Sequence, residues 1–185
     1  MKKTVYLSLL VAAALLMAAC GGKKQKKDAW VAPEHEARML RLPDYQLSDS
    51  VRLGGHIYAY DIVRLASDSL PMVKDDMDDF YADNTIQLSI RKDGTAYFRH
   101  TFTKATFASD ISDTDYAASI LDGIRFVKAE AGQGLTFSFA VSYPESDMSV
   151  LFLLTVADNG TFSFVKNENL EGDESDTLYL HDDGV

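Results

Sequence analysis

A strict alternation of apolar and small polar side chains restricts the segment "GLTFSFAVSYP" to a β-strand. Its odd-numbered residues from Leu135 to Tyr143 are apolar or aromatic, and the residues between them are Thr, Ser or Ala. The segment "HIYAYDIVRL" alternates in the same way, with Tyr58, Tyr60 and Ile62 on one face. Because side chains of a strand point to opposite faces in turn, each pattern predicts one face on a core.

Two dipeptides predict hairpin turns, Asp93-Gly94 and Asn159-Gly160. In the first hairpin, a two-residue turn would set Leu88 opposite Arg99. A three-residue loop over residues 92–94 would set Leu88 opposite Phe98 and Ile90 opposite Ala96. We expect the second register, because it pairs apolar with apolar side chains and a slip of one residue exchanges the two faces.

The same test on the second hairpin favours a three-residue loop over residues 158–160. This loop pairs Val156 with Phe162 and Leu154 with Phe164. Both hairpins are therefore predicted to have a type I turn followed by a glycine bulge.

The patterns together predict a mainly β, possibly α+β, fold: a single antiparallel meander sheet of about seven strands with one short helix. The sheet can be curled, a half-barrel or a sandwich. "VLFLLTV" is apolar on both faces, which predicts a central strand. The helix is expected to begin after Ser112 as N-cap, with Tyr116 and Ile120 facing inward and Gly123 after its end.

The first 19 residues have the features of a bacterial export signal. Lys2 and Lys3 precede an apolar run of about fifteen residues, too short to span a membrane. Cys20, the only cysteine, follows two small residues, as in lipoprotein signals whose cysteine becomes the acylated first residue. The lysine-rich stretch behind it predicts a tether. We therefore expect a cell-envelope protein that is anchored to the membrane through acyl chains such as palmitate on Cys20.

The chain is expected to divide into a signal peptide (1–19), an acylated tether and arm (20–52), a β-rich domain (53–167) and an acidic, disordered tail (168–185). Residues 28–52 are expected to be extended or partly helical, and "EHEARMLRL" can form a short helix that Pro43 ends. All 28 acidic residues but only 12 of the 18 basic ones lie from Asp28 onward, which gives this part a net charge of −16. Such a charge excludes nucleic acid as a partner.

Several stretches of the chain, among them "RHTFTKATFAS" and "VSYPESD", resemble a family of Bacteroidetes lipoproteins catalogued as domain of unknown function 4738. The resemblance covers roughly residues 50–166 and the lipoprotein start. It implies a cell-envelope lipoprotein and provides no catalytic residues. Lipoproteins exported to the surface of such bacteria typically have acidic residues after the cysteine. The basic residues here therefore favour an outer-membrane protein that faces the periplasm.

The sequence predicts no catalytic constellation, metal site or cofactor. "HEARM" lacks the second histidine of a zinc-protease helix, and "KDDMDDFYADN" lacks the glycine of an EF-hand loop. The most promising segment is "RHTFTKATFASD", in which Phe98, His100 and Phe102 are expected to face inward. Candidate binding residues for an anionic or sugar ligand are Arg99, His100, Lys104, Tyr58 and Tyr97. The alternative is that His100 and the tyrosines pack in the sheet and that the cations balance nearby aspartates.

These observations favour a non-enzymatic module that binds an envelope protein or a small ligand. A hydrolase that acts on an envelope polymer or glycan is the alternative, and a structural spacer without a ligand is a third hypothesis.

Overall fold

The structure is a computed structural model, and it describes residues 36–167. The predicted signal peptide, Cys20, the lysine-rich tether and the acidic tail lie outside these residues. Neither helix of the described region is long and apolar enough to cross a membrane.

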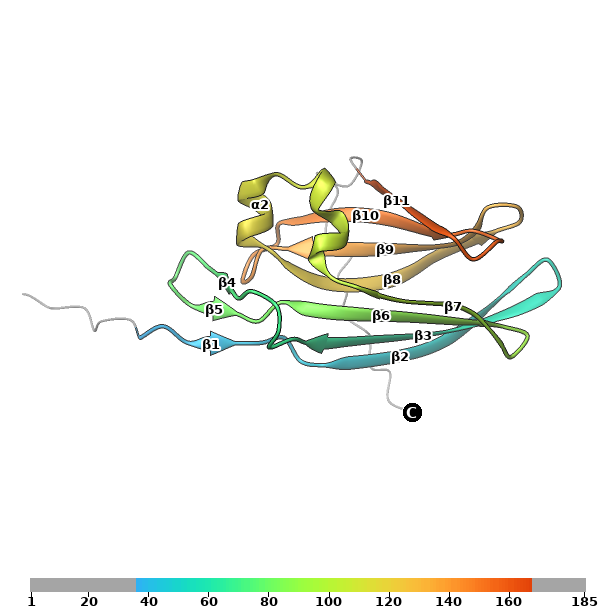
Figure 1. The fold of residues 1–185 in the computed structure, drawn as a ribbon, viewed down its shortest axis with the longest axis horizontal. Coiled ribbons are helices and arrows are strands. Elements are labelled where there is room, and N and C mark those ends of the chain that lie inside the picture. The colour runs from blue at the N-terminus through green and yellow to red at the C-terminus, as the bar shows by residue number, and fades with distance from the viewer. Residues whose placement is uncertain (1–35, 168–185) are drawn as a thin grey trace, which may run out of the picture. The chain divides into compact units, whose positions relative to one another are not determined.

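The described residues form two four-stranded antiparallel sheets and one small three-stranded sheet (Figure 1). The first sheet has the order β2-β3-β6-β7 and contains Tyr45–Leu53, His56–Ala66, Asn84–Lys92 and Thr95–Phe102. The second has the order β11-β10-β9-β8 and contains Phe162–Lys166, Ser149–Val156, Gly134–Ser142 and Ile120–Glu130. The small sheet, β1-β5-β4, contains Met39–Leu40, Phe80–Tyr81 and Val73–Lys74.

The mainly β character is confirmed, but the single sheet that the sequence predicted is wrong. A connection leads the chain from β7 in the first sheet to β8 in the second through the 3₁₀ helix η2 (Lys104–Asp110) and helix α2 (Asp113–Ala118). Helix α2 has the predicted N-cap, because the Ser112 hydroxyl accepts a hydrogen bond from the Asp115 N–H at 3.1 Å. It ends before Ile120, which begins β8 rather than the last helical turn.

The two four-stranded sheets pack face to face around one aromatic-rich core. The alternating residues singled out in the sequence are buried there, including Tyr58, Tyr60 and Ile62 of β3 and four residues of β9. The ring of Tyr60 stacks on Phe126 of the opposite sheet, with ring centroids 5.3 Å apart. β10 is an inner strand of its sheet, as its doubly apolar pattern predicted.

The register predicted for the second hairpin, at Asn159-Gly160, is confirmed, because Val156 pairs with Phe162 and Leu154 with Phe164. The N–H of Gly160 donates to the Ala157 carbonyl at 2.8 Å, and Gly160 has a φ of 78°, as a glycine bulge requires.

The three-residue loop and the register predicted for the first hairpin, at Asp93-Gly94, are wrong. Lys92 pairs with Thr95 across a two-residue turn, in which Asp93 and Gly94 both have positive φ, as in a type I′ turn. A β-bulge beyond Arg91 then inserts Tyr97, so that Leu88 pairs with His100 and Ile90 with Phe98.

Of the two alternatives for the arm, the described residues 36–52 take the extended one and contain no helix, and the predicted boundary between arm and β-rich domain at residue 53 is wrong. Residues 39–40 form a strand of the small sheet, and residues 45–53 form β2 at the edge of the first sheet. β2 pairs with β3 over its whole length, and Val51 lies opposite Tyr58.

Four hairpin turns of the large sheets lie together at one end, on the right in Figure 1, and the β9–β10 connection lies at the other. The turns follow β2, β6, β8 and β10. The small sheet, into which the chain runs from its N-terminal side, lies at the opposite end. We call these the loop end and the N-terminal end of the domain.

Candidate ligand-binding site

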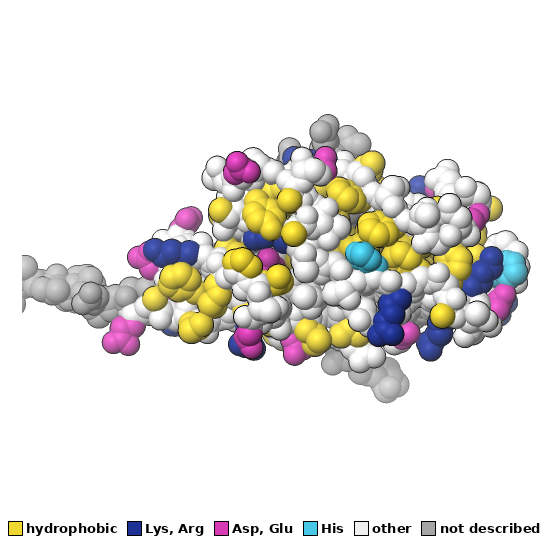
Figure 2. Space-filling model, viewed as in Figure 1, with side chains coloured by type: hydrophobic (Ala, Val, Ile, Leu, Met, Phe, Trp, Pro, Cys, Tyr) yellow, Lys and Arg dark blue, Asp and Glu magenta, His cyan; other side chains and the backbone are white. Residues whose placement is uncertain are grey.

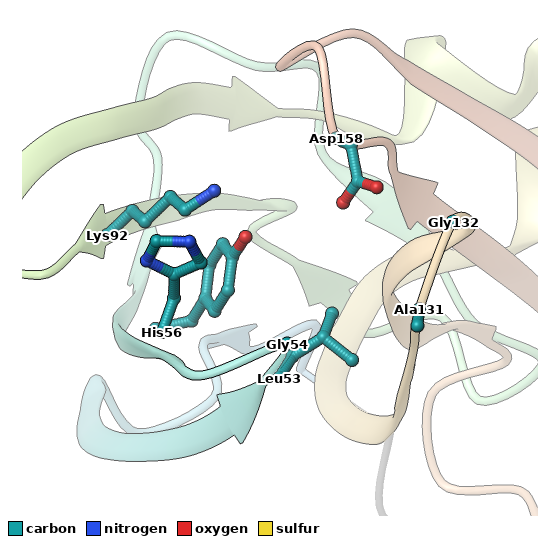
Figure 3. A pocket seen from close by; sticks show the side chains of 8 residues that line it. Leu53, Gly54, His56, Lys92, Ala131, Gly132 and Asp158 are labelled. Atoms are coloured by element: carbon teal, nitrogen blue, oxygen red, sulfur yellow. The ribbon is translucent and has the colours of Figure 1, made fainter.

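A pocket of about 210 Å³ opens at the loop end, between turns of both large sheets (Figure 3). We call it the loop-end pocket. Its walls are formed by Leu53, Gly54, His56, Tyr58, Lys92, Ala131, Gly132 and Asp158. The side chains of Lys92 and His56 lie on one side of the opening, and that of Asp158 lies across from them.

His56 is held in place by the type I′ turn that follows β6. Its Nδ1 lies 2.6 Å from Oδ2 of Asp93, and Oδ1 of Asp93 accepts the Ile57 N–H at 2.9 Å. The Ile57 N–H, and to a lesser extent His56, lower the pKa of the Asp93 carboxyl. Asp93 therefore stays ionised and fixes the imidazole, while Nε2 is the ring nitrogen that this contact does not use.

Lys92 extends over the two tyrosines that the sequence nominated. Its Nζ lies 5.3 Å from the ring centroid of Tyr58 and 6.0 Å from that of Tyr97. The hydrogen bond with Tyr58 raises the pKa of Lys92, against the opposing effect of desolvation. Lys92 is therefore a cation at neutral pH.

The bulge at Tyr97 brings this side chain against Tyr58. The two rings meet edge to face with centroids 5.5 Å apart, and the Tyr97 hydroxyl donates to the Ala157 carbonyl at 2.6 Å. Tyr97 thereby links β7 of the first sheet to the β10–β11 turn of the second, which fixes the floor of the site.

The pocket suits a small ligand with an anionic group. Its volume is below the roughly 300–1,000 Å³ typical of sites for drug-sized ligands, so it fits one terminal group or one sugar residue. Lys92 is positioned to bind an anionic oxygen, and Asp158 and Nε2 of His56 are positioned to accept hydrogen bonds from hydroxyl groups.

The five predicted binding residues do not converge. Tyr58 and Tyr97 meet beside the loop-end pocket, but Arg99 lies on the outer face of the first sheet, where it donates to the Gln87 side chain at 2.8 Å. His100 is half-buried and packs against Phe102 and Phe162, at centroid distances of 4.5 and 4.9 Å.

Lys104 does not line the pocket and is buried in the connection between the sheets. Its Nζ donates to the carbonyls of Tyr116 and Ser119 and lies 3.6 Å from Oδ2 of Asp83. Burial lowers the pKa of Lys104, and the charge of Asp83 opposes this shift. This geometry fits a structural role for the lysine.

The sequence nominated only one of the pocket residues, Tyr58. His56, Lys92, Asp93 and Asp158 were missed, because they belong to three different turns that only the packing of the sheets brings together. The one available signal was the pair of turn dipeptides, which marked Asp93 and the neighbourhood of Asp158 as exposed hairpin tips.

A second pocket of about 210 Å³ lies between β8, β9 and the loop after β9, and it contains the acidic residues Asp122, Glu145 and Asp147. Two of these carboxylates have protein partners. Asp122 accepts the Ser142 hydroxyl at 3.0 Å, and Glu145 accepts the Tyr81 hydroxyl at 2.7 Å. Their engagement makes this pocket the weaker candidate for ligand binding.

The fold and the pocket together define a two-sheet antiparallel β domain with a polar site formed by its hairpin turns. Residues 25–164 match the family described as Domain of unknown function (DUF4738), and the chain belongs to that family. No curated protein matches the sequence.

Proposed function

We propose that this protein is a lipid-anchored, non-enzymatic binding module of the cell envelope. The acylated residue is Cys20, the membrane is the outer membrane, and the domain faces the periplasm. In this proposal the loop-end pocket binds the anionic group of a small ligand, either the carboxylate of an acidic sugar or a phosphate.

The observation that carries the binding proposal is the placement of a fixed cation beside a fixed imidazole at one small pocket. Lys92 is held over Tyr58, and His56 is held by Asp93. The chain has a net charge of −10 and therefore repels anions in general. At the pocket, Lys92 attracts an anionic group locally.

The position of the pocket supports the same proposal. The chain runs into the domain at the N-terminal end, while the pocket lies at the loop end. An anchor at Cys20 would therefore hold the domain by the end remote from its binding site, which leaves the pocket open to the periplasm.

A hydrolase is the alternative function, and the His56–Asp93 pair is the feature that favours it, since such a pair activates a nucleophile in many hydrolases. None of the residues that line the pocket is Ser, Thr or Cys. Binding without turnover is therefore the function that this geometry supports best.

Calorimetry with glucuronate, glucose 6-phosphate and neutral glucose tests the binding proposal and distinguishes the two sources of negative charge. We expect binding of glucuronate or glucose 6-phosphate and none of glucose. Lys92→Met should weaken it about tenfold or more, because it removes a charge-assisted hydrogen bond. Arg99→Met, which removes an exposed cation from the outer face of the same hairpin, is the matched control and should change nothing.

Two results would contradict this assignment: equal heats for charged and neutral sugars, or equal losses in the two variants. The anchor is tested separately. Intact mass should show acyl chains on the mature protein, and Cys20→Ser should abolish both these chains and membrane fractionation.

A further inference from the structure

The small sheet at the N-terminal end has one packed face and one open face. Leu40, Val73 and Tyr81 point inward and pack with Ile120 of β8. Met39 and Lys74 are both register partners of Phe80, and since side chains alternate along a strand, these three residues share the open face.

This open face is unusually apolar for a surface of an acidic chain. Met39 is 77% exposed and Phe80 is 37% exposed, and Met77 in the turn between β4 and β5 is 60% exposed. Together with Met72 they are four of the nine large hydrophobic side chains that are exposed among the described residues. We call these four residues the anchor-side patch, and Figure 2 shows hydrophobic side chains gathered at this end.

The cations around the patch are paired with aspartates. Arg41 lies 2.9 Å from Asp68, Lys74 lies 2.5 Å from Asp78, and Arg38 pairs with Asp79. The pairs offset charge locally, so the acidic turn between β4 and β5 repels an anionic surface less than its composition indicates. The aliphatic stems of these exposed cations add apolar surface around the patch, and their charged groups can reach lipid headgroups.

The proposed anchor on Cys20 tethers this end of the domain to a membrane. Residues 21–38 separate Cys20 from Met39, and even fully extended they can span no more than about 65 Å. An anchored chain therefore keeps the small sheet within about 65 Å of the bilayer. Under this restriction a contact too weak to bind a free protein becomes populated, because the effective concentration of the surface is high.

We propose that the anchor-side patch inserts into the headgroup region of the membrane that holds Cys20, as a second membrane contact. This proposal rests on the proposed acylation of Cys20. The occupant is a lipid surface, because exposed Met and Phe side chains with flanking Arg and Lys are suited to the apolar–polar boundary of a bilayer. The contact orients the domain so that the loop-end pocket points away from the bilayer.

The test uses the full, acylated chain in vesicles of phosphatidylethanolamine with a minor share of phosphatidylglycerol. The only tryptophan, Trp30, is first removed by Trp30→Phe. Met39→Trp or Phe80→Trp then reports on the patch. Ile57→Trp, at a site that is also 40% exposed but lies at the loop end, is the matched control. Lipids brominated on their acyl chains quench tryptophans that reach the bilayer.

We expect quenching at positions 39 and 80 to exceed that at position 57 several-fold, with a blue shift of emission only in the presence of vesicles. Equal quenching at positions 80 and 57 in an acylated chain would overturn the patch proposal and leave the anchor intact. A blue shift without lipid that depends on protein concentration would show that a second copy covers the patch, and it would also overturn the proposal. An unacylated Cys20 in the intact mass would overturn both proposals.

Discussion

Lys104 of helix η2 lies with its ammonium nitrogen 3.6 Å from Oδ2 of Asp83, and both residues are at least 95% buried. The other carboxylate oxygen of Asp83 accepts the N–H groups of Asn84 and Leu121, at 2.8 and 2.7 Å. The pair therefore joins the start of β6, the start of β8 and the connection that changes sheets.

Lys104→Met should destabilise the domain by about 3 to 5 kcal/mol, because it leaves the Asp83 carboxylate and two buried carbonyls without their cation. Urea unfolding followed by circular dichroism measures the change. Lys74→Met, which removes a lysine from an exposed pair with Asp78, is the control and should cost at most about 1 kcal/mol. The double variant with Asp83→Asn should recover part of the loss. Similar losses for Lys104→Met and Lys74→Met would refute the role of the buried pair.

Gly134→Ala should destabilise the domain by about 3 kcal/mol or more, because Gly134 has a φ of 108° and an added Cβ would lie 2.0 Å from the Val156 carbonyl oxygen. Gly123→Ala is the matched control in the neighbouring strand, where an added Cβ meets nothing within 4 Å. It should be neutral or slightly stabilising, since alanine restricts the unfolded chain. In thermal unfolding, Gly134→Ala should therefore lower the Tm far more than Gly123→Ala.

Tyr60 should make the domain sensitive to alkali. Burial and the neighbouring Asp49 carboxylate raise the pKa of Tyr60 from 10.0 to about 12. Between these values the unfolded chain has lost a proton that the folded chain retains, so the free energy of unfolding falls as the pH rises through this window. Below pH 10 Tyr60 is protonated in both the folded and the unfolded chain, so this loss of stability is absent there. Tyr60→Phe should therefore lose less stability than the parent between pH 10 and about pH 12, as measured by urea midpoints. An unchanged slope would contradict the prediction.

His100→Phe should leave ligand binding unchanged, because His100 packs between Phe102 and Phe162 and does not line the loop-end pocket. Its stability should stay within about 1.5 kcal/mol of the parent, since the new ring has a similar shape and is apolar. Calorimetry with glucuronate and glucose 6-phosphate measures the affinity. If a folded His100→Phe variant binds neither ligand, the site lies between β7 and β11 and not at the loop end.

The strands that alternate cleanly could be predicted from the sequence, but β2 could not. Its residues Tyr45, Leu47, Val51 and Leu53 do alternate, and Asp49 interrupts their apolar row. The structure accommodates Asp49 at the open edge of the sheet, where its carboxylate accepts the Tyr60 hydroxyl at 3.3 Å. An inward-pointing charge on an edge strand also discourages pairing with further strands.

The register of the first hairpin depended on a bulge that the sequence does not mark. The test of apolar pairing assumed a uniform ladder, and that assumption holds for Asn159-Gly160 but fails at Tyr97. The number of sheets was equally hidden. Alternation shows that a strand has a buried face, but the connection through η2 and α2 determines which sheet that strand joins.

The candidate site was predictable only where a pocket residue lies within a strand, as at Tyr58. His56 and Lys92 lie at strand ends beside turns and Asp158 lies on a turn, and nothing in their local sequence specifies which turns become neighbours. Tyr97 was also among the predicted binding residues, and its contact with the Tyr58 ring depends on the bulge.

Each turn at the loop end closes a hairpin between two strands of one sheet, so its length can change without disturbing the pairing of the other hairpins. A lengthened turn after β8 or β10 would reshape one wall of the pocket and leave His56 and Lys92 in place. The domain therefore separates the part that must be preserved to fold from the part that can diversify. Variants with altered turns should therefore keep the scaffold, and the same turns are natural positions for grafted recognition loops.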